Sequence, residues 1–153
     1  MKKRKWEILF CVYLLFLFLV VILKFTGSFQ VLLDRMQAEP YGETYNLKPF
    51  STINSQLRQL SESWAQFNLI GNTIPFIPFG FLMPMSYRKK CSLGKVLLTG
   101  LLFVLFAELA QFYTNLGAFD VDDIILNMVA IFLGYLPVGI AGVVRKYKRK
   151  KKS

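Results

Sequence analysis

The sequence predicts an all-α integral membrane protein with four transmembrane helices and, after the first of them, an extracytoplasmic loop that carries an amphipathic helix. The chain of 153 residues is 54% hydrophobic, which is too apolar for an ordinary soluble domain of that length. Its 19 Lys and Arg residues outnumber 9 Asp and Glu residues and gather beside long apolar runs. We therefore expect a single membrane domain over residues 1–153.

The basic residues lie mainly in three short clusters. Residues 2–5 hold four cations, residues 88–95 hold four, and residues 145–152 hold seven. Lys and Arg beside transmembrane ends mark short cytoplasmic loops, so we expect a multi-pass protein of the plasma membrane with both termini in the cytoplasm. Placement of this kind explains the net charge of +10 without a polynucleotide. We expect membrane lipids, and no nucleic acid, as partners.

The first transmembrane segment is expected at about residues 6–25. The run from Ile8 to Leu23 has no charge, and about twenty helical residues span a hydrocarbon core of roughly 30 Å. A basic stretch before an apolar run also describes a signal peptide. We expect an uncleaved anchor, because the run is long and residues 24–28 make a poor cleavage site.

The second part of the chain, residues 27–66, is polar with nearly balanced charge, as suits an outer loop. A helical repeat of apolar residues follows a possible Ser51 or Thr52 cap and comprises Ile53, Leu57, Leu60, Trp64 and Phe67. This repeat indicates an amphipathic helix that lies on the outer interface or packs on the other segments.

The second transmembrane segment is expected at about residues 67–87, and it cannot be one regular helix. Pro75, Pro78 and Pro84 each remove a backbone donor and leave a carbonyl four residues earlier without its usual partner. In lipid such carbonyls must be satisfied internally, which predicts a kinked helix that lines a cavity. A kink tolerated for packing alone is equally compatible with the pattern.

The third and fourth segments are expected at about residues 93–113 and 121–144, and a basic tail is expected at residues 145–153. Residues 96–107 and 124–144 carry no charge. The tail is interpreted as an anchor on anionic lipid, with docking to a protein as the alternative. The chain would thus cross the membrane four times.

Polar residues recur at spacings of three and four near the outer ends of three segments, so each set shares a helix face. We expect them to converge in one binding site made of Asn68, Asn72, Glu108, Gln111, Asp120, Asp122, Asp123 and Asn127. Intramembrane acids are costly and usually face a bundle interior, which makes Glu108 a functional candidate. A structural acid bonded to nearby amides is the alternative.

Any chemistry would have to use carboxylates, amides, Tyr, Lys or Arg, because the chain has no histidine. The candidate catalytic residues are Glu108, Asp120 and Asp123, and a crowded acidic cluster could also hold a divalent cation. Capping of a helix N-terminus is the alternative for Asp120. Cys11 and Cys91 lie far apart and predict neither a disulfide nor a zinc site.

At these same residues the sequence resembles the VanZ-like family over about residues 46 to 135. The matching blocks are residues 46–50, 68–72, 75–84, Glu108 with Gln111 and Phe112, 119–127, and Gly134 with Tyr135. An arginine often found in the family before the acidic block is missing from residues 114–119. The resemblance implies a small polytopic membrane protein of bacteria, whose namesake is associated with low-level resistance to teicoplanin-type glycopeptides.

Together these observations favour a protein that binds or handles a cell-envelope component, such as a lipid-linked cell-wall precursor or a glycopeptide. One alternative is an intramembrane enzyme that uses carboxylates or a metal on a lipid-linked substrate. Another is a structural or regulatory membrane partner, in which the polar residues only hold the helices together.

Overall fold

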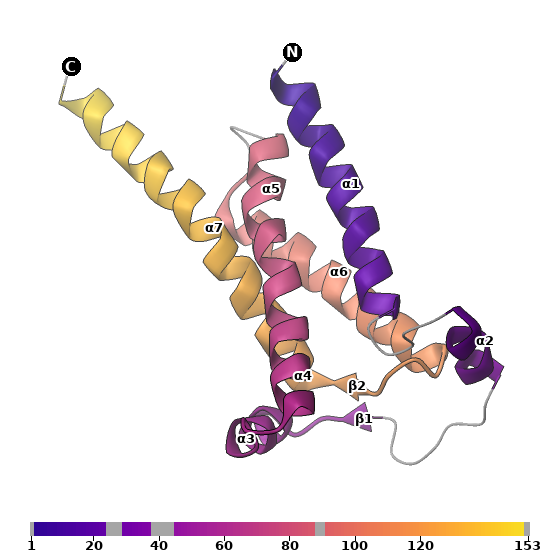
Figure 1. The fold of residues 1–153 in the computed structure, drawn as a ribbon. Helices are drawn as coiled ribbons and strands as arrows, with labels where there is room; N and C mark the ends of the chain where they lie inside the picture. The colour runs from indigo at the N-terminus through magenta and orange to yellow at the C-terminus, as the bar shows by residue number, and fades with distance from the viewer. Residues whose placement is uncertain (1, 24–28, 38–44, 88–90, 152–153) are drawn as a thin grey trace.

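A computed structural model describes residues 2–23, 29–37, 45–87 and 91–151 of the chain (Figure 1). Helices dominate it, and the strands are only two residues long. The α-helices are α1 (Lys2–Leu23), α2 (Phe29–Gln37), α3 (Ser51–Arg58), α4 (Ser63–Thr73), α5 (Ile77–Tyr87), α6 (Leu93–Tyr113) and α7 (Val121–Lys150). A 3-10 helix η1 (Ile74–Phe76) joins α4 to α5, and strand β1 (Tyr45–Asn46) pairs with strand β2 (Phe119–Asp120).

Three helical stretches of the described chain are long and apolar enough to cross a membrane. They are Ser63–Tyr87, Leu93–Tyr113 and Val121–Val144. These stretches coincide with the second, third and fourth predicted segments, although the first of them begins four residues before the predicted start. The chain is thus a multi-pass, predominantly α-helical membrane protein.

The stretch Ser63–Tyr87 is interrupted where its prolines predict a break. Pro75 lies in the first turn of η1, and the tighter 3-10 turn separates α4 from α5. The hydroxyl of Tyr13 on α1 donates a hydrogen bond to the carbonyl of Pro75 at 2.7 Å. The predicted interruption of the regular helix is confirmed, and the hydrogen bond from Tyr13 ties α1 to this break.

The core of the bundle is the crossing of α5 with α7, where glycine lets the two backbones touch. A Cβ atom added to Gly80 would lie 1.9 Å from the carbonyl oxygen of Ile131, and one added to Gly134 would lie 1.8 Å from that of Ile77. Small residues at such positions allow close helix packing in membranes. Around the crossing, α1 and α6 supply aromatic and aliphatic side chains, including Phe10 and Phe103 against Phe79.

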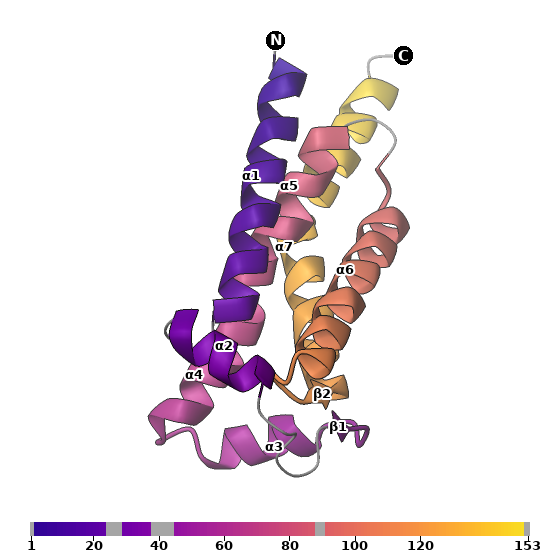
Figure 2. The ribbon, with the colours of Figure 1, turned by 90° about the vertical axis from the view of Figure 1, so that its right-hand side faces the viewer.

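The two ends of the described chain lie at the same end of the bundle. Figures 1 and 2 show α1 beginning, and α7 ending, at the end opposite to α3, β1 and β2. The chain runs away from this end along α1, returns along α4 and α5, runs away again along α6 and returns along α7 (Figure 2). The polar loop and strands therefore cover one end of the helices, and the basic chain ends project from the other.

The amphipathic helix predicted over Ile53 to Phe67 is wrong in its extent. Helix α3 ends at Arg58, and the backbone N–H of Gln59 turns back to the carbonyl of Gln56 in a tighter bond. A second turn then closes between Gln59 and Glu62, so Trp64 and Phe67 belong to α4. The apolar repeat therefore continued across two helices that meet at a turn. Helix α2 was not anticipated either.

The predicted end of the fourth membrane segment at residue 144 is confirmed, although helix α7 itself continues beyond it to Lys150. The basic tail is therefore helical over most of its length. No glycine or proline follows Val144 to stop the helix, and Lys and Arg are good helix formers. Cations are also favoured at a helix C-terminus by the macrodipole.

Candidate functional site

The site begins at the pairing of β1 with β2, which brings together two segments seventy-four residues apart. The strands pair in parallel, with Asn46 opposite Asp120. The side-chain amide of Asn46 donates to Asp120 Oδ1 at 3.2 Å, and the hydroxyl of Thr52 donates to Asp120 Oδ2 at 2.6 Å. Both of these donors to the Asp120 carboxylate are neutral groups.

Asp122 is fully buried and binds the N-terminus of α3. Its carboxylate accepts the backbone N–H groups of Phe50, Thr52 and Ile53, the last two at 2.7 and 3.1 Å. These N–H groups have no partner within their own helix, and a carboxylate there is also favoured by the helix dipole. Phe50 takes up a left-handed conformation with φ of 65°, which turns the chain into α3. Asp122 is therefore a helix cap supplied from α7.

Asp120 has a second role, as the cap of α7 itself. It precedes Val121, the first residue of the helix, and its Oδ1 accepts the backbone N–H of Asp122 at 2.8 Å. An acceptor at this position satisfies one of the free donors of a helix N-terminus. The capping alternative for Asp120 is thus the one that its contacts support.

Glu108 and Gln111 lie one turn apart near the end of α6 and are both buried. The backbone N–H of Asp120 points to Glu108 Oε2 at 3.4 Å, which links α6 to the start of α7. The amide of Gln111 donates to the carbonyl of Val21 at 3.0 Å. Gln111 thus ties α6 to the last described turn of α1.

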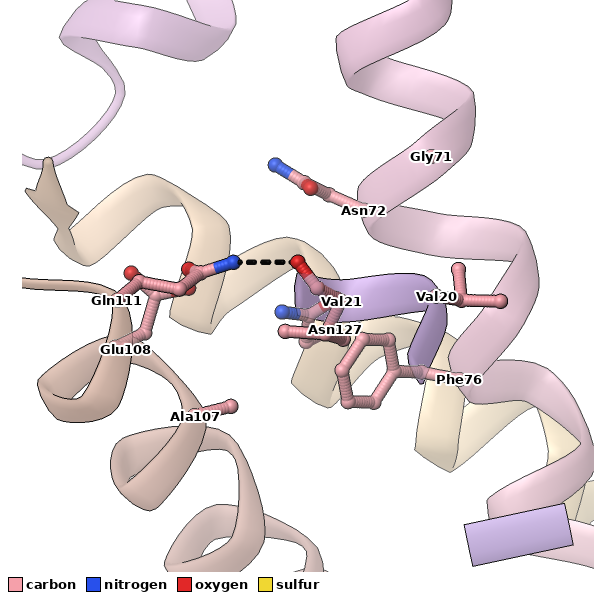
Figure 3. Close-up of a pocket in the computed structure, with 9 residues that line it drawn as sticks. All are labelled: Val20, Val21, Gly71, Asn72, Phe76, Ala107, Glu108, Gln111 and Asn127. Atoms are coloured by element: carbon pink, nitrogen blue, oxygen red, sulfur yellow. Dashed lines mark hydrogen bonds between the residues drawn. The ribbon is translucent and has the colours of Figure 1, made fainter. Parts of the chain in front are cut away.

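A small polar cavity lies where α1, α4, α6 and α7 meet. Its volume is about 10 Å³, which is about the least space that one water molecule needs. Figure 3 shows Asn72 projecting from α4 toward the side chains of Glu108 and Gln111 on α6. The lining residues are Val20, Val21, Gly71, Asn72, Phe76, Ala107, Glu108, Gln111 and Asn127.

Asn127 is the unusual member of this cavity. It is 4% exposed, and among the described residues none donates a hydrogen bond to its Oδ1. Burying an amide oxygen without a donor costs about 1–3 kcal/mol. A hydrogen-bond donor placed in this cavity, beside Glu108, would satisfy the Asn127 oxygen.

A second, apolar cavity of about 210 Å³ lies between α1, α2 and α6. It is lined mainly by Phe18, Met36, Phe103, Phe106, Ala110 and Leu116. Val21, Ala107 and Gln111 line both cavities. The hydrogen bond from Gln111 to Val21 thus lies in the wall between a polar and an apolar space.

The structure places the predicted site residues in two groups. Asn72, Glu108, Gln111 and Asn127 line the polar cavity, while Asp120 and Asp122 cap helices at its outer end. Neither Asn68 nor Asp123 is among the residues that line the cavity. Among the described residues, no three acidic or cysteine side chains come together in a geometry that could hold a metal ion.

Sequence reasoning missed Asn46 and Thr52, which bind the Asp120 carboxylate, and the carbonyl of Val21. Asn46 stood within a block of the family resemblance, and Thr52 was named as a candidate cap. The link between them and the acidic block had no local signal, because it depends on the β1–β2 pairing.

Comparison with known proteins agrees with the resemblance seen in the sequence. The model of a family described as VanZ/LLP1 matches residues 10–142. Protein VanZ of Enterococcus faecium is 34% identical over 107 residues, which are 70% of this chain and 58% of that relative. The match thus covers less than two thirds of the relative's length. No solved structure matches the chain. The predicted resemblance is confirmed, and the chain belongs to the VanZ/LLP1 family.

Proposed function

We propose that the protein crosses the bacterial plasma membrane four times and has both ends in the cytoplasm. Helix α1 would be the span that precedes the three long apolar stretches. Helix α1 has 22 residues, enough for a bilayer core of about 30 Å. The start of α1 and the end of α7 are both rich in Lys and Arg, and they lie at the same end of the bundle (Figure 2). Clusters of Lys and Arg favour the cytoplasmic side, so α3, β1 and β2 would face outward.

This orientation can be tested by cysteine labelling after Cys11 and Cys91 are replaced by serine. Glu62 is exposed beside α3, and Lys151 follows α7. A membrane-impermeant thiol reagent should label Glu62→Cys in intact cells, and Lys151→Cys only after the membrane is opened. The reverse pattern would contradict the proposed orientation.

We further propose that the protein binds or handles an envelope component, such as a lipid-linked cell-wall precursor or a glycopeptide. In this way it would contribute to resistance to teicoplanin-type glycopeptides. The observation that carries this proposal is the polar cavity, where Glu108 and the unsatisfied oxygen of Asn127 are buried together. Buried acids and amides in a membrane bundle are costly and associated with function. Membership of the VanZ/LLP1 family supports the envelope context.

Their contacts support a division of roles among the polar residues. Asp120 and Asp122 cap helices, and Gln111 ties α6 to α1, so these three would hold the site together. Glu108 and Asn127 would accept hydrogen bonds from the ligand. A cavity this small admits a single donor group, such as a hydroxyl, an amide N–H or an ammonium group.

The test compares glycopeptide susceptibility in a bacterial strain in which deletion of this protein changes susceptibility. Glu108→Gln and Asn127→Leu should lose the protection at membrane levels equal to wild type. Glu62→Gln is the matched control, because Glu62 is an exposed acid at the same end of the bundle. Full protection by both cavity variants would remove this cavity from the function.

A further inference from the structure

The apolar cavity beside the proposed binding site has the properties of a hydrocarbon site. Its volume is about 210 Å³, and its lining is almost wholly apolar. An apolar cavity of about 150 Å³ inside a protein stays dry and takes up benzene, so this one is large enough for a segment of alkyl chain.

The cavity lies where a chain from the bilayer can enter. Phe18 of α1 and Phe106 of α6 line it and are 39% and 61% exposed, on faces whose other residues are also apolar. Those faces would contact lipid in a membrane, whose hydrocarbon consists mainly of acyl chains. By mass action, the abundant acyl chain is the occupant that the surroundings favour.

The adjacent polar cavity restricts the headgroup of such an occupant. The two cavities share the side chains of Val21, Ala107 and Gln111. The polar one offers acceptors, the Glu108 carboxylate and Asn127 Oδ1, in a space of about 10 Å³. A hydroxyl or a primary ammonium group can donate there. A trimethylammonium group has no donor and is too large.

We infer that the paired cavities bind one glycerolipid, with an acyl chain in the apolar cavity and a hydroxyl or ammonium donor of the headgroup in the polar cavity. This inference rests on the proposed function, and it names a glycerolipid as the envelope component that the same site binds, in place of a polyprenyl-linked precursor or a glycopeptide. The hydrogen bond from Gln111 to Val21 holds the wall between the two cavities in place. The lipid would extend along this wall from one cavity into the other.

The experiment measures lipids retained by the purified full-length protein. The protein is exchanged into equal mixtures of lipids with identical acyl chains and glycerol, ethanolamine or choline headgroups, and bound lipid is counted by native mass spectrometry. Wild type should retain the glycerol or ethanolamine lipid over the choline lipid, and which of the two is retained identifies the donor. Equal retention of all three would overturn the inference.

Two variants separate the chain site from the headgroup site. Ala110→Phe fills the apolar cavity and should abolish retention, whereas Leu98→Phe on the exposed face of α6 should not. Asn127→Leu should keep the lipid but lose the preference among headgroups. Retention by Ala110→Phe equal to that of Leu98→Phe would contradict the chain site.

A measurement on wild type needs no variant to fold. A glycerolipid with a photoactivatable acyl chain should cross-link near Met36 and Phe103 more than near Leu98 and Leu102, which only face outward. Uniform labelling, or stronger labelling by a photoactivatable polyprenyl phosphate, would contradict an acyl site. If lipid is retained but the cavity variants still protect cells, the proposed function fails alone. If those variants abolish protection and no lipid is retained, this inference fails alone.

Discussion

The carboxylate of Asp122, at the start of α7, accepts the backbone N–H of Thr52 at 2.7 Å and so caps a helix that begins seventy residues earlier. Acids at the first turn of a helix commonly serve that same helix. Here Asp120 serves α7, and Asp122 is directed to α3 instead. Two acids of one short motif thus join the outer loop to the membrane helices.

Replacing Asp122 by alanine should destabilise the protein through the loss of this cap. Three backbone N–H groups at the start of α3 would lose their acceptor in a partly buried place, at a cost of about 1–3 kcal/mol. The fall should appear as a lower melting temperature in detergent and faster proteolysis between residues 46 and 62. Glu62→Ala, an exposed acid nearby, should change neither; an unchanged Asp122→Ala would show that the cap contributes little.

Replacing Gly134 by alanine should disrupt the crossing of α5 and α7. Its new Cβ would lie 1.8 Å from the carbonyl oxygen of Ile77, which is backbone and cannot move alone. Overpacking of this kind costs about 1–3 kcal/mol or more, because the helices must separate. The folded fraction in membranes should therefore fall sharply.

Gly142→Ala is the control for that prediction on the same helix. A Cβ there meets nothing within 4 Å, so this variant should be as stable as wild type or slightly more stable. Equal folded fractions for the two variants would contradict the close approach of α5 and α7.

Replacing Asn127 by leucine should leave the protein as stable as wild type or stabilise it, by up to about 1–3 kcal/mol, while the proposed activity is lost. Leucine has a similar size and removes the buried oxygen that lacks a donor. The measurement is thermal unfolding in detergent beside the susceptibility assay. A clear loss of stability would show instead that the Asn127 amide holds the fold together.

The thiol of Cys91 should react slowly at neutral pH. Burial raises its pKa above the usual value, and nearby Lys95 only partly offsets this effect. Since the thiolate is the reactive form, a raised pKa means less thiolate at neutral pH and faster alkylation only as the pH rises toward the pKa. Rates of maleimide-type alkylation between pH 7 and 10 measure this shift, with Cys11 replaced by serine.

An exposed thiol serves as the control that distinguishes the effect of burial on Cys91 from the pH dependence that any thiol shows. Ser92→Cys in a chain lacking both native cysteines places a thiol at an exposed neighbour. It should react faster at neutral pH and reach its plateau at a lower pH than Cys91. Identical profiles would contradict the effect of burial.

Much of the fold could be read from local patterns. The apolar runs predicted the segments Leu93–Tyr113 and Val121–Val144, and the prolines predicted the break at η1. Sequence patterns were less informative where a turn ends a helix, and for this reason the predicted amphipathic helix extends beyond the end of α3. They also did not show that α7 continues through the basic tail to Lys150.

The sequence by itself determined the lengths of the apolar helices, the position of the break in the second of the predicted segments, and the set of polar residues near one end of the helices. These features follow from composition and spacing along one chain. Only the tertiary structure decided which of those residues cap helices and which line a cavity. Asp122 meets Thr52, and Gln111 meets Val21, through contacts between distant segments that no local pattern encodes. A carboxylate or amide becomes a cap or a binding group according to the donors that packing brings to it, and that pairing is a property of the whole bundle.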